Sequence, residues 1–198
     1  MKLKELFLAS KGYIPLDNNG AWLYRKNPIF SIKKAAKLFN DIKGSNIIEI
    51  GSGLQGKMSG NSMYYWSKLT NAKSIIAIDM DKKELESLTP LLSKYKSIKA
   101  MQVNGVEYLK TYNEKISLLY LDFWSPDNKS EIIGTNRAKD YLNAYLNAKD
   151  KFNNQAIILI DDSDHVAPWK HSLIIPEARK DGFFVKWTGR QTLLFKPE

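Results

Sequence analysis

Apolar residues are arranged along the chain in two patterns, which alternate from about residue 28 to the C-terminus. Short continuous runs such as Asn46–Ile50 and Ile116–Leu121 are typical of strands buried on both faces. The segments between them carry apolar residues at helical spacing, as in 28–41, which begins at a proline. The strands are expected at 46–50, 74–78, 98–103, 116–121 and 156–160, and the helices at 28–41, 59–70, 82–95, 105–112, 137–152 and 172–180.

This alternation predicts an α/β fold with a doubly wound, mostly parallel sheet covered by helices on both faces. Near the C-terminus, 183–187 and 191–195 flank a Thr-Gly-Arg turn, which predicts a hairpin that adds an antiparallel strand. The 198 residues fit a single domain, with an N-terminal helical region at 1–43 and a core at 44–198. Ligands of such sheets bind beyond the carboxyl ends of the strands, so the residues that follow each strand are the candidates for function.

A glycine-rich turn follows the first predicted strand. Residues 51–56, Gly-Ser-Gly-Leu-Gln-Gly, match the pattern G-x-G-x-x-G, in which glycines allow a tight turn and close approach of a ligand to the backbone. Asp79 ends the next strand, where a carboxylate can accept hydrogen bonds from ribose hydroxyls. These two features suit NAD and S-adenosylmethionine alike. Glu49 separates the two cofactors, because a charged side chain inside a buried strand needs a partner and is rare in NAD-binding strands.

The segment 47–53 resembles motif I of class I S-adenosylmethionine-dependent methyltransferases, in which an acidic residue stands two positions before the first glycine. The resemblance extends over nearly the whole chain in the order of elements, including the final hairpin strand. It implies a Rossmann-like fold, with the acidic residue anchoring the loop, the turn lining methionine and ribose, and the next strand end binding ribose and adenine. The implied cofactor-binding residues are Glu49, Gly51, Ser52, Gly53, Asp79, Met80, Asn104 and Gly105.

Acidic residues follow the fourth and fifth predicted strands. Asp122, Asp161 and Asp162 would lie close together there and would repel one another, and a divalent cation would relieve that repulsion. The arrangement resembles divalent-metal-dependent O-methyltransferases of the catechol and macrolide-sugar types. It implies that these three residues hold Mg²⁺, which binds an acceptor hydroxyl and lowers its pKa. The alternative is that the acids only end the strands, because Asp is common at turns.

Asp122 and His165 are the candidate catalytic residues. His165 lies four residues after Asp161, and histidine is the side chain best suited to proton transfer at neutral pH. The lysine that catechol-type enzymes carry three residues after their strand-four Asp is absent here, where that position is Ser125. The alternative for His165 is an ordinary loop histidine.

The formal net charge of +9 and the pI of about 9.5 suit an anionic partner such as nucleic acid. The lysines are spread along the chain, however, and scattered lysine mainly favours solubility. No cysteine is present, which excludes disulfides and thiolate metal sites. No apolar run reaches the roughly 20 residues of a membrane span, so no membrane partner is expected and the expected location is the cytoplasm.

Together these features predict an S-adenosylmethionine-dependent methyltransferase that methylates a hydroxyl of a small molecule with the help of Mg²⁺. A nucleic-acid methyltransferase is the first alternative, although the Asn/Asp-Pro-Pro-Tyr/Phe tetrad typical of amino-methylating enzymes is absent. A non-catalytic module of the same fold that binds the cofactor or a partner is the second. No heptad run or additional helical arm marks an oligomeric interface.

Overall fold

The computed structural model describes residues 13–14, 25–26, 28–52, 62–123, 133–164 and 169–198, and these residues form a seven-stranded sheet, a separate two-stranded sheet and the surrounding helices. The strands are β1 (Tyr13–Ile14), β2 (Arg25–Lys26), β3 (Asn46–Ile50), β4 (Ser74–Asp79), β5 (Ile98–Gln102), β6 (Ile116–Leu121), β7 (Phe152–Ile160), β8 (Phe184–Trp187) and β9 (Thr192–Lys196). The helices are α2 (Ile29–Asp41), α3 (Ser62–Leu69), α4 (Lys82–Glu86), α5 (Thr89–Lys94), α6 (Gly105–Thr111), α7 (Ile133–Ala148) and α8 (Ile174–Lys180), with a 3₁₀ turn η1 (Lys149–Lys151).

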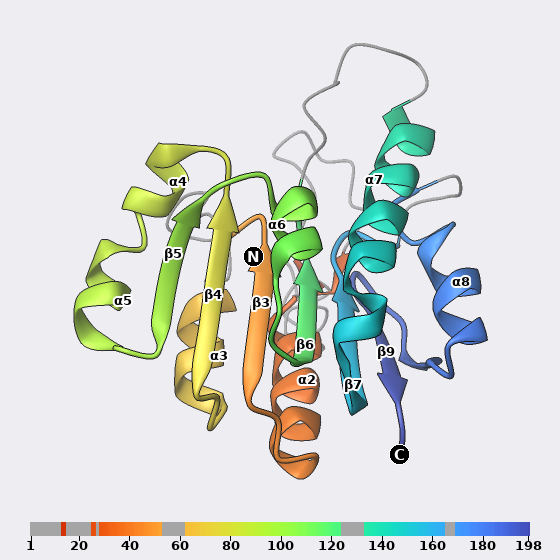
Figure 1. The fold of residues 1–198 in the computed structure, drawn as a ribbon, viewed down its shortest axis with the longest axis horizontal. Helices are drawn as coiled ribbons and strands as arrows, with labels where there is room; N and C mark the ends of the chain where they lie inside the picture. The colour runs from red at the N-terminus through yellow and green to blue at the C-terminus, as the bar shows by residue number, and fades with distance from the viewer. Residues whose placement is uncertain (1–12, 15–24, 27, 53–61, 124–132, 165–168) are drawn as a thin grey trace, which may run out of the picture.

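The strand order of the large sheet is β5-β4-β3-β6-β7-β9-β8, and every pairing from β5 to β7 is parallel. β9 lies between β7 and β8 and is antiparallel to both, so it points downward in Figure 1 while β3 to β6 point upward. The start of β9 therefore lies beside the end of β7, where Thr192 pairs with Ile160. Residues that precede β9 reach the same edge of the sheet as residues that follow the parallel strands.

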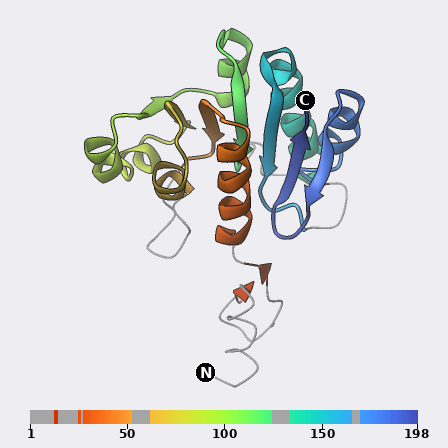
Figure 2. The same cartoon turned by 90° about the horizontal axis from the view of Figure 1, so that it is seen from below.

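Helices cover the two faces of the sheet (Figures 1 and 2). Side chains alternate between the faces along each strand, so Ile48 and Ile50 pack under α6, α7 and α8, while Ile47 packs under α2 and α3. Each face contains its own apolar cluster, which explains why the central strands are apolar at nearly every position. Glu49 points to the same face as Ile47, toward α3.

All the predicted strands and helices of the described residues are present, and the α/β prediction is confirmed. Residues 82–95 form two helices, α4 and α5, in place of the single helix that the sequence predicts. Pro90 lies in the first turn of α5, a position that needs no backbone N–H. β7 begins at Phe152, four residues before the predicted start, and the pairing of β6 with β7 shifts in register between Ile116 and Leu118.

The N-terminal region, predicted to be helical, contains α2 and also the short antiparallel pair β1 and β2, which lies beyond one end of α2 in Figure 2. Within the part of the chain that the structure describes, no helix combines the length and apolar character needed to cross a membrane.

Candidate functional site

The turn after β3 is held between the ends of β4 and β6. Gly51 has a φ of +89°, in the left-handed region that favours glycine. A Cβ atom at this position would lie 2.1 Å from the carbonyl oxygen of Asp122, so a side chain cannot be accommodated. The Gly51 amide donates to the carbonyl oxygen of Ile78 (2.8 Å), and the Asp122 amide donates to that of Ile50 (2.8 Å). The predicted cofactor turn and the predicted acidic cluster are therefore in direct contact.

Ser52 stabilises this turn from inside the protein. Its buried hydroxyl donates to the carbonyl oxygen of Glu49 (2.9 Å) and accepts a hydrogen bond from the amide of Ile78 (3.0 Å). The side chain thus fixes the backbone of β3 against that of β4. Gly53, the next residue predicted to bind cofactor, lies outside the described residues.

The buried side chain of Glu49 has two hydrogen-bond donors, as the sequence required. Oε1 accepts from the hydroxyl of Ser62 (2.5 Å), and Oε2 accepts from the indole Nε1 of Trp66 (2.7 Å). Both donors belong to α3. Burial is the main reason why the pKa of Glu49 rises to about 8, with the two hydrogen bonds acting in the opposite direction. Glu49 therefore ties β3 to the helix that comes after the glycine-rich segment.

Asp79 and Met80 lie at the end of β4, directly beside the Gly51 turn. Ile50 pairs with Ile78, which places Gly51 level with Asp79. Asp79 is partly buried, and its Oδ1 accepts a hydrogen bond from the amide of Asp81 (2.8 Å). Met80 is 58% exposed. A carboxylate beside an exposed apolar side chain fits ribose hydroxyls and the flat face of an adenine.

Asn104 and Gly105 form the start of α6. The Asn104 side-chain oxygen caps the helix by accepting hydrogen bonds from the amides of Val106 (3.0 Å) and Glu107 (3.2 Å). A Cβ atom at Gly105 would lie 2.4 Å from a side-chain carbon of Ile50. Both residues thus have a structural role in packing α6 against β3, beside the cofactor role that the resemblance implies.

The three aspartates come together as predicted, because β6 and β7 are neighbouring parallel strands. Two cations lie among them. The ammonium of Lys170 is 3.9 Å from Oδ1 of Asp122 and 3.6 Å from Oδ2 of Asp162. The guanidinium of Arg190 is 3.5 Å from Oδ2 of Asp161 through Nη2 and 3.3 Å from Oδ1 of Asp162 through Nε. The carboxylates are therefore neutralised in large part by side chains of the same chain.

Two neutral side chains complete this group. The Gln191 amide nitrogen donates to the hydroxyl oxygen of Tyr120 and to Oδ1 of Asp161, each at 2.6 Å. The Tyr120 hydroxyl in turn donates to Oδ2 of Asp122 (3.3 Å). Burial, and then the nearby Asp122, raises the pKa of Tyr120 well above its usual range, so Tyr120 acts as a neutral donor. We call these seven residues the carboxylate cluster: Tyr120, Asp122, Asp161, Asp162, Lys170, Arg190 and Gln191.

The carboxylate cluster does not fit a divalent cation. Over the residues that the structure describes, no group of three or more His, Cys, Asp or Glu is arranged to hold a metal ion. The positions around Asp161 and Asp162 are taken by Arg190, Lys170 and Gln191. The structure thus gives no support to the predicted Mg²⁺ site, although it confirms that the three acids lie together.

Asp122 is the most accessible carboxylate of the carboxylate cluster. Its side chain is 31% exposed, whereas those of Asp162 and Asp161 are 11% and 2% exposed. Burial and the charge of Asp161 raise the pKa of Asp122 well above its usual range, while Lys170 acts in the opposite direction. This is the carboxylate that a bound molecule could reach from the Gly51 turn.

His165, the other candidate catalytic residue, lies outside the described residues. The sequence interpretation missed four members of the carboxylate cluster: Tyr120, Lys170, Arg190 and Gln191. Tyr120 carries the only side-chain hydroxyl in the otherwise apolar run 118–121, and this exception in the sequence could have marked it as a site residue. The other three residues carry no local signal, since Lys170 comes from the segment before α8, and Arg190 and Gln191 come from the segment before β9.

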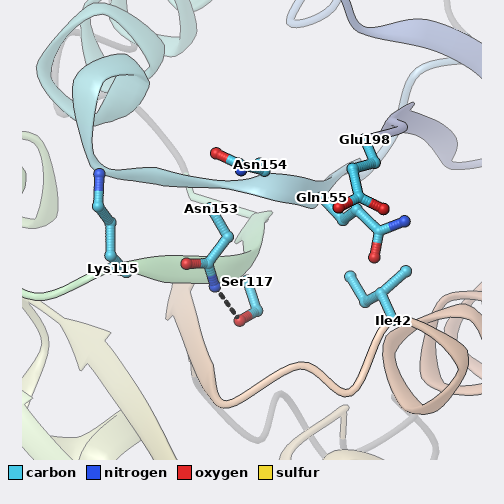
Figure 3. Close-up of a pocket in the computed structure, with 7 residues that line it drawn as sticks. All are labelled: Ile42, Lys115, Ser117, Asn153, Asn154, Gln155 and Glu198. Atoms are coloured by element: carbon cyan, nitrogen blue, oxygen red, sulfur yellow. Dashed lines mark hydrogen bonds between the residues drawn. The ribbon is translucent and has the colours of Figure 1, made fainter.

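A polar hollow of about 320 Å³ lies at the opposite edge of the sheet, near the start of β6 and of β7 (Figure 3). In it, the Asn153 amide nitrogen donates to the hydroxyl of Ser117 (2.8 Å). None of the residues that line the hollow belongs to the predicted site. They are Ile42, Lys115, Ser117, Asn153, Asn154, Gln155 and Glu198.

No family model matches the chain, and no curated protein matches it in sequence. Solved structures do match in fold. TrmK of M. capricolum, solved with S-adenosylhomocysteine, has 18% sequence identity and a TM-score of 0.54, and the match covers 84% of this chain. This chain spans 66% of the length of that protein.

Two further matches cover almost the whole chain. A proposed caffeoyl-CoA O-methyltransferase from Staphylococcus aureus has 12% identity and a TM-score of 0.59, covering 98% of this chain and 90% of its own. A proposed RNA methyltransferase from Pyrococcus horikoshii has 16% identity and a TM-score of 0.53, covering 98% and 96%. The chain therefore has the Rossmann-like fold of S-adenosylmethionine-dependent methyltransferases, with the C-terminal antiparallel strand that the sequence predicted.

Proposed function

We propose that this protein is an S-adenosylmethionine-dependent methyltransferase whose cofactor binds across the carboxyl ends of β3, β4 and β5. The observation that carries the proposal is the position of Asp79 level with the glycine turn at Gly51, at the end of parallel neighbouring strands. The fold matches a protein solved with S-adenosylhomocysteine, which supports the choice of cofactor. When bound, S-adenosylmethionine supplies a methyl group on its sulfonium.

In this proposal Asp79 binds the ribose hydroxyls and Met80 lies against the adenine. Glu49 acts indirectly, since both its oxygens are engaged by α3, and it holds that helix against β3 beside the Gly51 turn. The full proposed cofactor set is the one that the resemblance implies: Glu49, Gly51, Ser52, Gly53, Asp79, Met80, Asn104 and Gly105.

On the acceptor side we assign the leading role to Asp122. Its backbone touches Gly51, and its carboxylate is the accessible one of the carboxylate cluster, so it lies next to the proposed cofactor turn. Asp122 would accept the proton of an acceptor hydroxyl, and the methyl group that S-adenosylmethionine would supply would go to that oxygen. The raised pKa makes the Asp122 carboxylate a stronger base than that of an ordinary aspartate. His165 is a second proposed group for proton transfer. The proposed acceptor is a small molecule with a hydroxyl group.

Methylation of nucleic acid is the alternative, favoured by the net charge of +9 and by the fold match to a proposed RNA methyltransferase. The two acceptors are separated by salt dependence. A nucleic acid held by phosphate contacts loses affinity steeply as salt rises, because bound counterions are released. If the protein retains RNA or DNA and that retention falls steeply as the salt concentration rises, the alternative is favoured.

The cofactor proposal is tested by calorimetric titration of S-adenosylhomocysteine into the wild-type protein and into Asp79→Ala. Loss of hydrogen bonds to a charged group should weaken binding by about tenfold or more. Asp150→Ala is the matched control, because Asp150 is exposed in η1, next to Lys115 and away from the ends of β3 and β4. Equal affinity of Asp79→Ala and the wild type for S-adenosylhomocysteine would contradict the proposal.

A further inference from the structure

We propose that the ammonium group of Lys170 takes the place of a divalent cation at the carboxylate cluster, so that the site works without metal. The assignment of a role in methyl transfer rests on the proposed function, whereas the charge arrangement itself does not. It makes Lys170 a positioning residue, which acts through Asp122.

Lys170 is placed inside the protein, where an ammonium group must be compensated by nearby charge. Its side chain has no exposed surface, and its Nζ lies between the carboxylates of Asp122 and Asp162. The ring of Tyr141 lies 5.4 Å from Nζ, within the range of a cation–π contact. Tyr141 is itself fixed beside the site, because its hydroxyl donates to the carbonyl oxygen of Phe123 (3.0 Å).

The backbone around Lys170 holds it in this position. Trp169 and Ser172 exchange hydrogen bonds, from the Trp169 amide to the Ser172 hydroxyl (2.8 Å) and from the Ser172 amide to the Trp169 carbonyl oxygen (2.8 Å). The guanidinium of Arg137, on α7, lies 4.8 Å from the centre of the Trp169 ring. Lys170 thus projects from a hydrogen-bonded turn shortly before α8, and Arg137 of α7 packs against that turn.

Every carboxylate oxygen of the three aspartates faces a donor of this chain. For Asp161 these are Gln191 at Oδ1 and Arg190 at Oδ2, at 2.6 Å and 3.5 Å. For Asp162 they are Arg190 at Oδ1 and Lys170 at Oδ2, at 3.3 Å and 3.6 Å. For Asp122 they are Lys170 at Oδ1 and Tyr120 at Oδ2, at 3.9 Å and 3.3 Å.

A divalent cation would therefore have to displace these donors. Mg²⁺ binds carboxylate oxygens at about 2.1 Å, so an ion bound to Asp122 and Asp162 would lie against the Lys170 ammonium. The two like charges would repel each other strongly in a buried site. The same geometry predicts that removal of the ammonium leaves carboxylates that a divalent cation can bind.

The first experiment titrates Mg²⁺ into the wild-type protein by calorimetry and measures the melting temperature in millimolar Mg²⁺ and in EDTA. The expected result is no saturable heat and the same melting temperature in both. Saturable Mg²⁺ binding that Asp122→Asn abolishes would overturn the proposal. This measurement does not depend on the folding of any Lys170 variant.

The second experiment compares Lys170→Met, which keeps most of the apolar stem of the side chain, with the wild type. Without the ammonium the variant should melt lower in EDTA, and Mg²⁺ should raise its melting temperature by mass action. Lys82→Met is the control, because it removes the same charge from an exposed ion pair with Glu86. A Lys170→Met protein that Mg²⁺ stabilises no more than it stabilises Lys82→Met would overturn the proposal.

Binding of S-adenosylhomocysteine to the wild type in EDTA keeps the two proposals apart. Unchanged affinity in EDTA is expected, and a loss of affinity that Mg²⁺ restores would overturn the role of Lys170. If S-adenosylhomocysteine does not bind under any condition, the proposed function fails, while the response of the melting temperatures to Mg²⁺ still decides the charge arrangement.

Discussion

Replacement of Glu49 by Gln should make the protein more stable at neutral pH and should flatten its pH dependence. The pKa of Glu49 is raised by burial from 4.5 to about 8, so the folded protein keeps this carboxyl group protonated at pH 7. The unfolded chain ionises it above pH 4.5, near the ordinary value. The contribution of Glu49 to stability is therefore complete below pH 4.5 and is lost as the pH rises toward 8.

The magnitude follows from proton linkage. Between these two pKa values, each pH unit removes about 1.4 kcal/mol from the free energy of unfolding. From pH 4.5 to pH 7 the loss amounts to about 3 kcal/mol. A glutamine has the size of the protonated acid. Its oxygen can accept from Trp66, and its amide nitrogen can donate to Ser62, so the hydrogen bonds of this position are kept without the titration.

The assay is urea unfolding of the wild type and Glu49→Gln between about pH 5 and pH 8, followed by circular dichroism. At pH 7 the variant should be more stable by about 3 kcal/mol, which for a chain of this length raises the melting temperature by roughly 6–12 °C. Glu107→Gln, in an exposed pair with Lys110, should show no such difference. Parallel pH profiles of the wild type and Glu49→Gln would refute the assignment of a raised pKa to this buried carboxyl.

Two further substitutions test the geometry of the site. Gly51→Ala forces a side chain into the left-handed region and against the Asp122 backbone, so it should destabilise the protein by more than about 1 kcal/mol in thermal unfolding and abolish calorimetric binding of S-adenosylhomocysteine. A stable Gly51→Ala protein that binds normally would contradict the observed turn. Gln191→Leu removes the donor that Tyr120 and Asp161 share, and it should cost about 1–3 kcal/mol in urea unfolding. An unchanged unfolding midpoint would show that this buried contact contributes nothing.

The fold could be predicted because its signals are local. β6 is buried along its whole length, and a strand covered on both faces by helices is apolar at successive positions. The start of β7 was misplaced because Asn153, Asn154 and Gln155 are polar and lie where the pairing with β6 shifts in register. Which residues of β7 pair with β6 depends on contacts between the two strands, and no local pattern in either one specifies them.

The candidate site could be predicted only in part, for a related reason. Asp79 ends a parallel strand, and Asp122 and Asp161 each follow one, so the rule that ligands bind beyond the carboxyl ends made them candidates directly. The burial of Glu49 required a partner, and the structure supplies Trp66, which lies on the next helix. Lys170 follows no strand end and stands in no motif, so its position among the acids depends on the tertiary packing of the segment before α8.

The reversed direction of β9 explains why the sequence predicts a metal site at acids that contact Arg190 and Gln191 in the structure. In a purely parallel sheet, all residues at the ligand-binding edge follow strands, and here those residues are mostly acidic. Because β9 is antiparallel and lies next to β7, the residues that precede it, Arg190 and Gln191, arrive at the same edge and face Asp161. The charge of the carboxylate cluster therefore depends on the insertion of β9 between β7 and β8. The sequence of the acidic segments alone, or of the hairpin alone, does not predict that charge.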